Sequence, residues 1–274
     1  MDKVTIPEED VIALESIAAG VVGLRVLIVN VYAISESPSK WILVDTGLPL
    51  SGHRIRSWAE SHFGKGSRPE YILLTHGHFD HTGAVVELAQ EWDVPVYVHS
   101  LEVPFVTDQS AYPPPDPFVG GGVMALLSKL YPRGPVDLGN RVKTVPADGS
   151  IPEFNDWRWI HTPGHTVGHI SLYRERDRTM IVGDAFVTTK QESFLAVATQ
   201  RPELHGPPAY YTTDWDAARE SVERLAALRP FAVATGHGKP LSGEDVPERL
   251  SALASNFDRV ARPAHGRYVD DPAA

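Results

Sequence analysis

Three histidines and an aspartate lie within six residues of the sequence, in the stretch HGHFDH at residues 76–81. Imidazole and carboxylate groups suit zinc, iron and manganese, and both can bind these ions without help from a thiolate. In an extended segment His76 and His78 point to the same side, so both can reach one cation. Asp80 and His81 follow where the chain turns toward a helix, so they can reach a second cation. The stretch therefore predicts a site for two metal ions rather than a group of solvated loop histidines.

Three later segments offer further ligands, each at or near the end of a predicted strand. His165 lies in the Pro-Gly turn of HTPGHTVGHIS, Asp184 ends the apolar run of IVGDAF, and His237 stands between glycines in ATGHGKP. Glycine beside a ligand lets the backbone approach closely and adopt turn conformations. Each residue taken alone has an ordinary explanation as a turn residue. Together they can complete the metal site that the HGHFDH stretch predicts.

The elements that must position these residues alternate between strands and helices. Apolar, β-branched runs at 24–34 and 41–45 predict the two strands of a hairpin. Residues 71–75, 83–92 and 94–100 predict a strand, a helix and a second strand, which together form a βαβ unit. The second half of the chain also contains both strands and helices. Strands are predicted at 157–161, 169–174, 179–184 and 231–236, and helices within 214–230 and 247–262.

Residues 103–135 are dense in proline and glycine around one short helical pattern, which predicts a long functional loop. We interpret this segment as a candidate lid, with Gly120–Gly121–Gly122 as its hinge. Its apolar side chains could form the wall of a substrate pocket, or they could complete the core or an oligomer contact. These side chains are Phe105, Tyr112, Phe118, Met124 and Leu127.

Composition and charge narrow the classes of function. The 274 residues are 42% hydrophobic, which is enough for one large domain or two small ones. Twenty-five basic against 35 acidic residues give a net charge of -10, which opposes binding to nucleic acid and to anionic membranes. The chain has no cysteine, so a metal must rest on histidine and carboxylate ligands. An acidic amino terminus and the lack of a long apolar span predict a cytoplasmic protein without a membrane segment. The oligomeric state stays open, with a homodimer as one option.

The HGHFDH stretch matches the HxHxDH motif of the metallo-β-lactamase superfamily, and PGHT, GDA and GHG follow in that superfamily's order. The chain resembles this superfamily over residues 24–240, and within it the ligand set is most similar to the glyoxalase II and lactonase-like branch. The resemblance implies an α/β fold of the αββα sandwich type with the metals at one edge of the two sheets. We expect one domain over residues 1–274, in which 103–135 is a lid insertion and 241–274 is a carboxy-terminal helix and tail.

The resemblance also implies a role for each ligand. The ligands of one metal ion would be His76, His78 and His165. Those of the other would be Asp80, His81 and His237, with Asp184 bridging both ions. Asp45, in the LVDTG segment, matches a position that orients the site, although it could instead be an ordinary turn aspartate.

The remaining histidines have weaker patterns. His161 and His169 flank the third ligand motif, and we interpret them as residues that support the ligands or pack beside them. The others have no partner pattern and count as ordinary: His53, His62, His99, His205 and His265.

The expected chemistry is metal-assisted hydrolysis. Two divalent ions about 3.5–4 Å apart can hold a hydroxide between them and make it available at neutral pH. Asp80 would orient that hydroxide or relay its proton to the leaving group. We expect two ions per chain, most naturally Zn²⁺, with iron or manganese as alternatives, and a small-molecule substrate that contains an ester, lactone or thioester bond.

Departures from the family pattern keep other hypotheses open. True β-lactamases of the superfamily have Cys or Ser at the position of Asp184, and its lactonases commonly have Tyr at the position of Val187. The glutathione thioesterases have a basic carboxy-terminal helical region, to which Arg259, Arg262 and Arg267 are similar. The alternatives are a mononuclear iron persulfide dioxygenase, a β-lactamase, a phosphodiester hydrolase, and a non-catalytic binding domain stabilised by metal.

Overall fold

The computed structural model describes residues 11–119, 123–190 and 202–273. The chain divides into two compact units, of which the first is Met1–Tyr112 with Gly134–Val145 and the second is Pro113–Arg133 with Pro146–Ala274. Each unit has one sheet and its own helices. In the parts of the chain that are described, no helix is long and apolar enough to cross a membrane.

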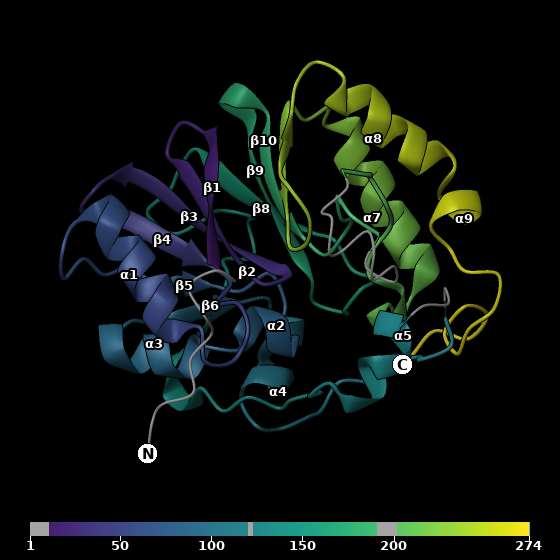
Figure 1. Cartoon of the computed structure of the whole chain (residues 1–274), viewed down its shortest axis with the longest axis horizontal. Helices are drawn as coiled ribbons and strands as arrows, with labels where there is room; N and C mark the ends of the chain where they lie inside the picture. Colours follow the sequence, from purple (N-terminus) through teal and green to yellow (C-terminus); the bar gives the residue numbers. More distant parts are fainter. Residues whose placement is uncertain (1–10, 120–122, 191–201, 274) are drawn as a thin grey trace. The chain divides into compact units, whose positions relative to one another are not determined.

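The first unit is built on a seven-stranded sheet with the order β1-β2-β3-β4-β5-β6-β7 (Figure 1). Pairing is antiparallel from β1 to β4 and parallel from β4 to β7. The strands are β1 (Val11–Ala18), β2 (Val21–Val26), β3 (Val29–Ser37), β4 (Lys40–Val44), β5 (Ile72–Leu73), β6 (Val96–Val98) and β7 (Val142–Thr144). The predicted hairpin is confirmed as β3 and β4, and the predicted βαβ unit as β5, α3 and β6.

The prediction of one strand over residues 24–34 is wrong, because a turn at Leu27 separates β2 from β3. Leu27 has a left-handed backbone with φ 57°, and the turn pairs Val26 with Val29. Leu27 is 41% exposed although it is apolar. The hydrophobic run therefore continues through the turn and conceals it in the sequence.

Two helices, α1 (Gly52–Phe63) and α3 (Val85–Trp92), contribute to the core of the first unit together with the sheet. Trp41 of β4 is fully buried at their junction, with ring-centroid distances of 4.4 Å to Phe63 and 6.0 Å to Trp92. Aromatic contacts of this kind add about 0.5–1.5 kcal/mol to the free energy of burial. They fix β4 and its neighbour β5, whose ends lead into the residues of the predicted site. The short helices of this unit are α2 (Phe79–Thr82) and α4 (Val103–Val106).

The second unit has a five-stranded sheet with the order β12-β11-β10-β9-β8. Only β10 and β11 pair in parallel, and the other neighbours are antiparallel. The strands are β8 (Trp157–His161), β9 (Ile170–Arg174), β10 (Thr179–Gly183), β11 (Ala232–Thr235) and β12 (Leu241–Ser242). The four strands predicted from the sequence in this half are confirmed as β8 to β11.

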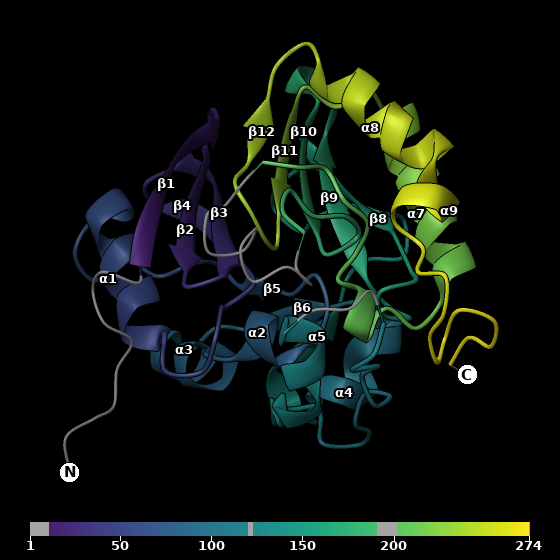
Figure 2. The same cartoon turned by 45° about the vertical axis from the view of Figure 1, so that its right-hand side comes forward.

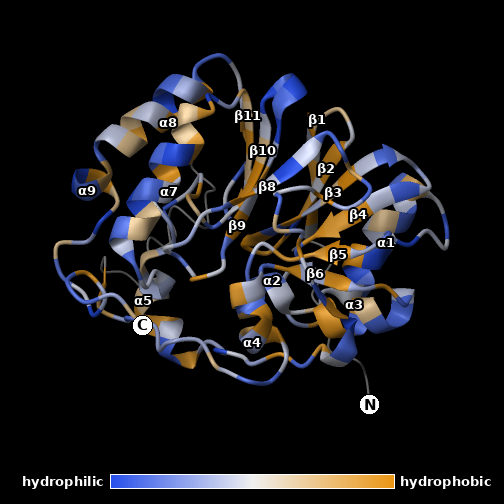
Figure 3. Ribbon diagram, turned by 180° about the vertical axis from the view of Figure 1, so that it is seen from behind, coloured by the Kyte–Doolittle hydropathy of each residue, from blue (hydrophilic) through white to orange (hydrophobic). Residues whose placement is uncertain are grey.

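Among its described residues, the second unit has the α-helices α5 (Val123–Leu127), α7 (Trp215–Ala227), α8 (Val246–Ser255) and α9 (Phe257–Val260). Helices α7 and α8 lie side by side (Figure 2). The carboxylate of Asp214 caps α7 by accepting the N–H of Ala217 at 2.9 Å. Figure 3 shows both helices with hydrophilic and hydrophobic turns in alternation, whereas the sheet strands are mostly hydrophobic. The helix predicted within 247–262 is confirmed, but it is interrupted at Asn256 between α8 and α9.

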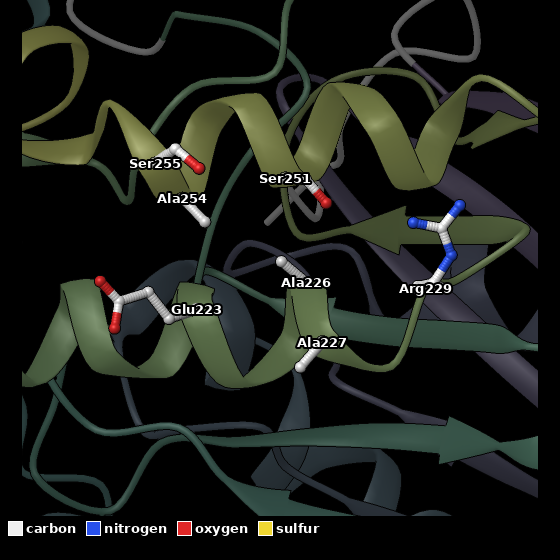
Figure 4. A pocket seen from close by; sticks show the side chains of 7 residues that line it. All are labelled: Glu223, Ala226, Ala227, Arg229, Ser251, Ala254 and Ser255. Atoms are coloured by element: carbon white, nitrogen blue, oxygen red, sulfur yellow. The ribbon is translucent and has the colours of Figure 1, made fainter.

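A groove of about 430 Å³ lies between α7 and α8 (Figure 4). Its lining side chains are small or charged: Glu223, Ala226, Ala227, Arg229, Ser251, Ala254 and Ser255. One carboxylate without a histidine does not make a ligand set for a transition metal. The groove therefore has no part in the predicted metal chemistry.

The candidate lid is divided between the two units. Residues 103–112 and 134–135 belong to the first unit, and Pro113–Arg133 belongs to the second. The predicted hinge at 120–122 lies outside the described residues, and so does the side chain of Met124. Opening of the lid, the single domain over residues 1–274 and the packing role of residues 241–274 stay predictions.

Candidate metal centre

The HGHFDH stretch connects β5 to α2 in the first unit. Leu74 continues the direction of β5, with its N–H bonded to the carbonyl of Tyr97 at 2.9 Å. His78 still has an extended backbone, with φ -63° and ψ 152°, and it immediately precedes α2. Its carbonyl accepts the N–H groups of His81 and Thr82 at 2.9 and 3.0 Å. The extended part presents His76 and His78, and the first helical turn presents Asp80 and His81, as the sequence predicts.

All four of these side chains are buried and close together. His76, His78 and His81 are at most 3% exposed, and Asp80 is 8% exposed. Ligand atoms of His76 lie within 4.8 Å of those of His78 and His81, and Asp80 and His81 are equally near each other. Burial of so many polar groups in one place is costly unless hydrogen bonds or a cation compensate it. The arrangement suits cation binding.

Asp45 lies beside this stretch and orients two of its residues. It follows β4 with a left-handed backbone, φ 61°, which aspartate tolerates better than most residues. Its Oδ1 accepts the N–H of Thr75 at 2.8 Å, and its Oδ2 accepts the hydroxyl of Thr75 and Nδ1–H of His81, both at 2.8 Å. Since a carboxylate only accepts, a neutral His81 has its proton on Nδ1 and the metal-binding lone pair on Nε2. This geometry favours an orienting role for Asp45 over that of a turn residue.

The same reasoning assigns the tautomer of His76. The hydroxyl of Thr75 has one proton, which it donates to Asp45, so its oxygen can only accept from Nδ1 of His76 at 3.0 Å. A neutral His76 therefore also has its lone pair on Nε2. One carboxylate thus sets the orientation of two predicted ligands, directly for His81 and through Thr75 for His76.

The second unit contains the other predicted ligands. Asp184 follows β10 and His237 follows β11, and since these strands are parallel, their carboxyl ends meet at one edge of the sheet. Asp184 and His237 are 2% and 1% exposed. The N–H of Gly236 donates to the carbonyl of Gly183 at 2.7 Å, which joins the two strand ends directly before the ligands. Strand pairing is the reason that these two residues, distant in sequence, are neighbours.

His165 enters this site from the turn between β8 and β9. The hydroxyl of Thr212 donates to the carbonyl of Pro208 at 2.9 Å, so its oxygen accepts Nδ1–H of His165 at 3.3 Å. Nε2 of a neutral His165 then has the lone pair. The turn depends on Gly164, φ 128°, because a Cβ there would lie 2.3 Å from the backbone nitrogen of Ala218 in α7.

Distances within the second unit fit donors that share a cation. Two ligand atoms bonded to one tetrahedral ion at about 2.0–2.1 Å lie roughly 3.3 Å apart. Nε2 of His237 lies 3.2 Å from Oδ2 of Asp184, and Nε2 of His165 lies 3.5 Å from the same oxygen. The central place of this oxygen is what a bridging carboxylate requires.

His169 holds the backbone of Asp184. Its Nε2 accepts the N–H of Asp184 at 3.0 Å, so its proton lies on Nδ1 and is donated to the hydroxyl of Thr162 at 2.8 Å. His161 is less buried, and its Nε2–H donates to the carbonyl of Val167 at 2.9 Å. The structure thus places His169 behind a predicted ligand, and His161 at the end of β8, bonded to the turn that carries His165.

Two residues of the first unit contact the HGHFDH loop without having been predicted to do so. The N–H of Gly77 donates to Oε2 of Glu102 at 3.0 Å and to the hydroxyl of Tyr112 at 2.8 Å. Burial, together with the charge of Glu102, raises the pKa of Tyr112 well above its usual value of 10. From the sequence, Tyr112 was predicted only to be one of the apolar side chains of the candidate lid. The available signal for Glu102 was a lone acidic residue between apolar ones after a predicted strand.

The other five histidines do not enter a ligand group within the described parts of the chain. His62 hydrogen-bonds through Nδ1 to the carbonyl of Trp58, and His99 accepts the N–H of Leu101. Both contacts are local and stabilise a helix end or a turn. His53, His205 and His265 likewise stand outside the groups of potential ligands.

Comparison with known proteins agrees with this ligand chemistry. A family model described as the metallo-β-lactamase superfamily matches residues 24–237. The chain is 46% identical over 245 residues to the probable metallo-hydrolase YflN of Bacillus subtilis (strain 168), a match that covers 89% of this chain and 93% of the relative.

Solved structures of the same kind share the fold. BJP-1, a subclass B3 metallo-β-lactamase of Bradyrhizobium japonicum, has a TM-score of 0.59 at 18% identity, with 94% of this chain and 95% of that chain covered. TTHA1623, crystallised in a di-iron-bound form, has a TM-score of 0.54 at 24% identity, with 85% and 93% covered. These likenesses confirm the predicted fold class, an α/β fold of the αββα type, to which each unit contributes a sheet and helices.

Proposed function

The chain belongs to the metallo-β-lactamase superfamily, and from this premise we propose that it is a dinuclear metal-dependent hydrolase of a small ester, lactone or thioester. Similarity to a probable metallo-hydrolase and the groups of histidine and aspartate ligands make it a metal-binding member of that superfamily. The observation that carries the proposal is the carboxylate of Asp184, with the Nε2 atoms of two histidines 3.2 and 3.5 Å from one of its oxygens.

In this proposal each ligand has the role that resemblance to the superfamily implies. His76, His78 and His165 would hold the first ion. Asp80, His81 and His237 would hold the second, and Asp184 would be a ligand shared by both. Ions held by these residues would make water available as a nucleophile near neutral pH and would polarise the scissile carbonyl group. The imidazoles contribute lone pairs at Nε2 because Thr75, Asp45 and Thr212 hold the Nδ1 protons of His76, His81 and His165.

Asp80 has a second task in the proposed reaction. Its carboxylate lies in the first turn of α2, next to His81, and is nearly but not completely buried. From there it orients the attacking water and accepts its proton, which it passes to the leaving alkoxide or thiolate. An ester, lactone or thioester has a leaving group that this single proton transfer neutralises.

The second unit has exposed apolar side chains on a segment that is attached to the support of one ligand. Asp116 of the candidate lid donates its N–H to the carbonyl of Tyr210 at 2.8 Å, two residues before the Thr212 that orients His165. Segment 113–133 is thus attached to the segment that supports a ligand. Four of its apolar side chains are exposed: Phe118, Leu126, Leu127 and Leu130. Apolar side chains on a loop suit the acyl part of a substrate, which supports the choice of carboxylic esters and thioesters over phosphodiesters.

The test joins metal quantification to a substrate screen on one preparation. Protein purified without chelator is analysed for zinc, iron and manganese, because imidazole and carboxylate ligands suit all three. The same protein is assayed with p-nitrophenyl esters, lactones, acyl thioesters, phosphodiesters and a β-lactam. We expect about two equivalents of metal and hydrolysis of a carboxylic ester, lactone or thioester that a chelator abolishes. One equivalent of iron with oxygen uptake on a persulfide, and no hydrolysis, would instead identify a dioxygenase.

A further inference from the structure

We propose that Glu102 and Tyr112 form a buried clamp that holds Gly77 and thereby positions His76 and His78 for metal binding. This inference rests on the proposed function and concerns the first unit alone. Neither residue is a predicted ligand, and both act through the backbone of the loop that carries two ligands. The clamp consists of two acceptors that meet on one N–H group.

The contacts of the clamp converge on the residue between the two histidines. The N–H of Gly77 donates to Oε2 of Glu102 at 3.0 Å and to the hydroxyl of Tyr112 at 2.8 Å. The hydroxyl of Tyr112 in turn donates to the same Oε2 in a short hydrogen bond. Rotation of the Gly77 peptide would break both bonds to its N–H. This peptide sets the directions in which His76 and His78 leave the backbone.

Packing fixes Tyr112 in its place. Its ring stacks on Phe105 with centroids 4.0 Å apart and planes 10° apart, and the ring of His78 lies 4.5 Å from it. A Cβ at position 77 would lie 2.6 Å from the hydroxyl oxygen of Tyr112, so the approach requires glycine. The tyrosine therefore supports His78 by ring contact as well as through Gly77.

The place of Glu102 follows from the sheet. It ends a short turn, Ser100–Glu102, that begins two residues after β6, and β6 is the parallel neighbour of β5. The two strands deliver Glu102 and the HGHFDH loop to the same edge of the sheet. Glu102 is 1% exposed as a residue, and a carboxylate so deeply buried needs donors and positive charge nearby. Gly77 and Tyr112 supply two donors, and a cation on His76 and His78 would supply the charge.

The experiment compares three variants of the full chain. Tyr112→Phe removes the hydroxyl, and Glu102→Gln removes the charge while keeping the shape. Tyr71→Phe is the matched control, because Tyr71 is also 3% exposed but lies at the opposite end of β5, with its ring against Tyr97. Zinc affinity is measured by competition with a chelator, the visible spectrum is recorded with Co²⁺, and the thermal midpoint is measured in excess chelator.

We expect Tyr112→Phe and Glu102→Gln each to weaken zinc binding by about 10–100-fold and to change the Co²⁺ spectrum, as loss of a supporting contact does. Tyr71→Phe should change neither. If Glu102→Gln fails to fold, Tyr112→Phe alone decides the result. Variants that bind zinc as tightly as the wild type overturn the clamp, and so does a loss of affinity that Tyr71→Phe shares. Wild-type protein that binds no metal would overturn the proposed function and the clamp together.

Discussion

Replacement of Asp45 by asparagine should damage metal binding more than its conservative shape suggests. Asparagine has one accepting oxygen, which can keep the bond to the N–H of Thr75, and an NH₂ group that can only donate. That NH₂ group would face Nδ1–H of His81, where the carboxylate now accepts at 2.8 Å. With the amide in this orientation, His81 can relieve the conflict only if its proton moves to Nε2. The lone pair that should bind the metal is then lost.

The expected loss of metal affinity can be judged from the hydrogen bonds that a substitution of Asp45 removes. Loss of an outer hydrogen-bond partner of a ligand typically weakens metal binding 10–100-fold, or about 1.4–2.7 kcal/mol. Alanine at position 45 removes both acceptors but places no donor against His81, so the imidazole keeps its choice of tautomer. We therefore expect Asp45→Asn to bind the ion of His81 no more tightly than Asp45→Ala, although alanine leaves a cavity and unmatched donors and so destabilises the fold more.

The assay is zinc titration against a chelator, with unfolding by urea in excess chelator as the measure of the fold. Asp93→Asn is the control, because Asp93 has the same left-handed backbone, φ 51°, but lies on the surface beside Arg141. It should change the free energy of unfolding by no more than about 0.5 kcal/mol and leave zinc binding unchanged. Tighter zinc binding by Asp45→Asn than by Asp45→Ala would refute the tautomer argument. Zinc binding as tight as that of the wild type in both variants would also refute it.

Four further predictions concern metal content, the shared ligand Asp184, the candidate lid and the pH dependence of stability. Protein purified without chelator should contain two equivalents of transition metal, and less than half an equivalent of any such metal would contradict this. Asp184→Asn should weaken the second ion more than the fold, since it removes the charge of the bridge but keeps its shape; equal loss of both ions or gross unfolding would contradict it. Phe118→Ala should change the ranking of acyl-chain lengths in an ester series at unchanged metal content, as should Met124→Ala, whereas a uniform fall of all rates would make the segment a structural support. Because the pKa of Tyr112 is raised above its unfolded value, its stabilising effect is complete below pH 10 and is lost as the pH rises through the folded pKa. In urea titrations, stability should therefore fall less steeply above pH 10 in Tyr112→Phe than in the wild type.

The sequence by itself determined the identity of the candidate ligands and the elements that carry them. The HGHFDH stretch, Asp184 and His237 follow apolar runs whose length and β-branched composition mark strands, and the spacing of Val85 and Leu88 marks a helix. These patterns are local, since strand and helix periodicities repeat over a few residues. The position of a ligand just after such a run could therefore be predicted without knowledge of any distant contact.

Only the tertiary structure decided which residues hold the ligands. Thr212 meets His165 from 47 positions away, and Glu102 meets Gly77 from 25 positions away. Asp45 was already a candidate for orienting the site, but only the structure shows that it meets His81 from 36 positions away. Each contact depends on which strands pair and how closely the connecting turns pack. A threonine or glutamate has the same local pattern whether it orients a ligand or faces solvent. The turn at Leu27 was hidden for a related reason, because an exposed leucine carries the same hydrophobic signal as a buried one. Strand pairing and side-chain packing join residues across the chain, and the identity of a residue does not reveal its partner.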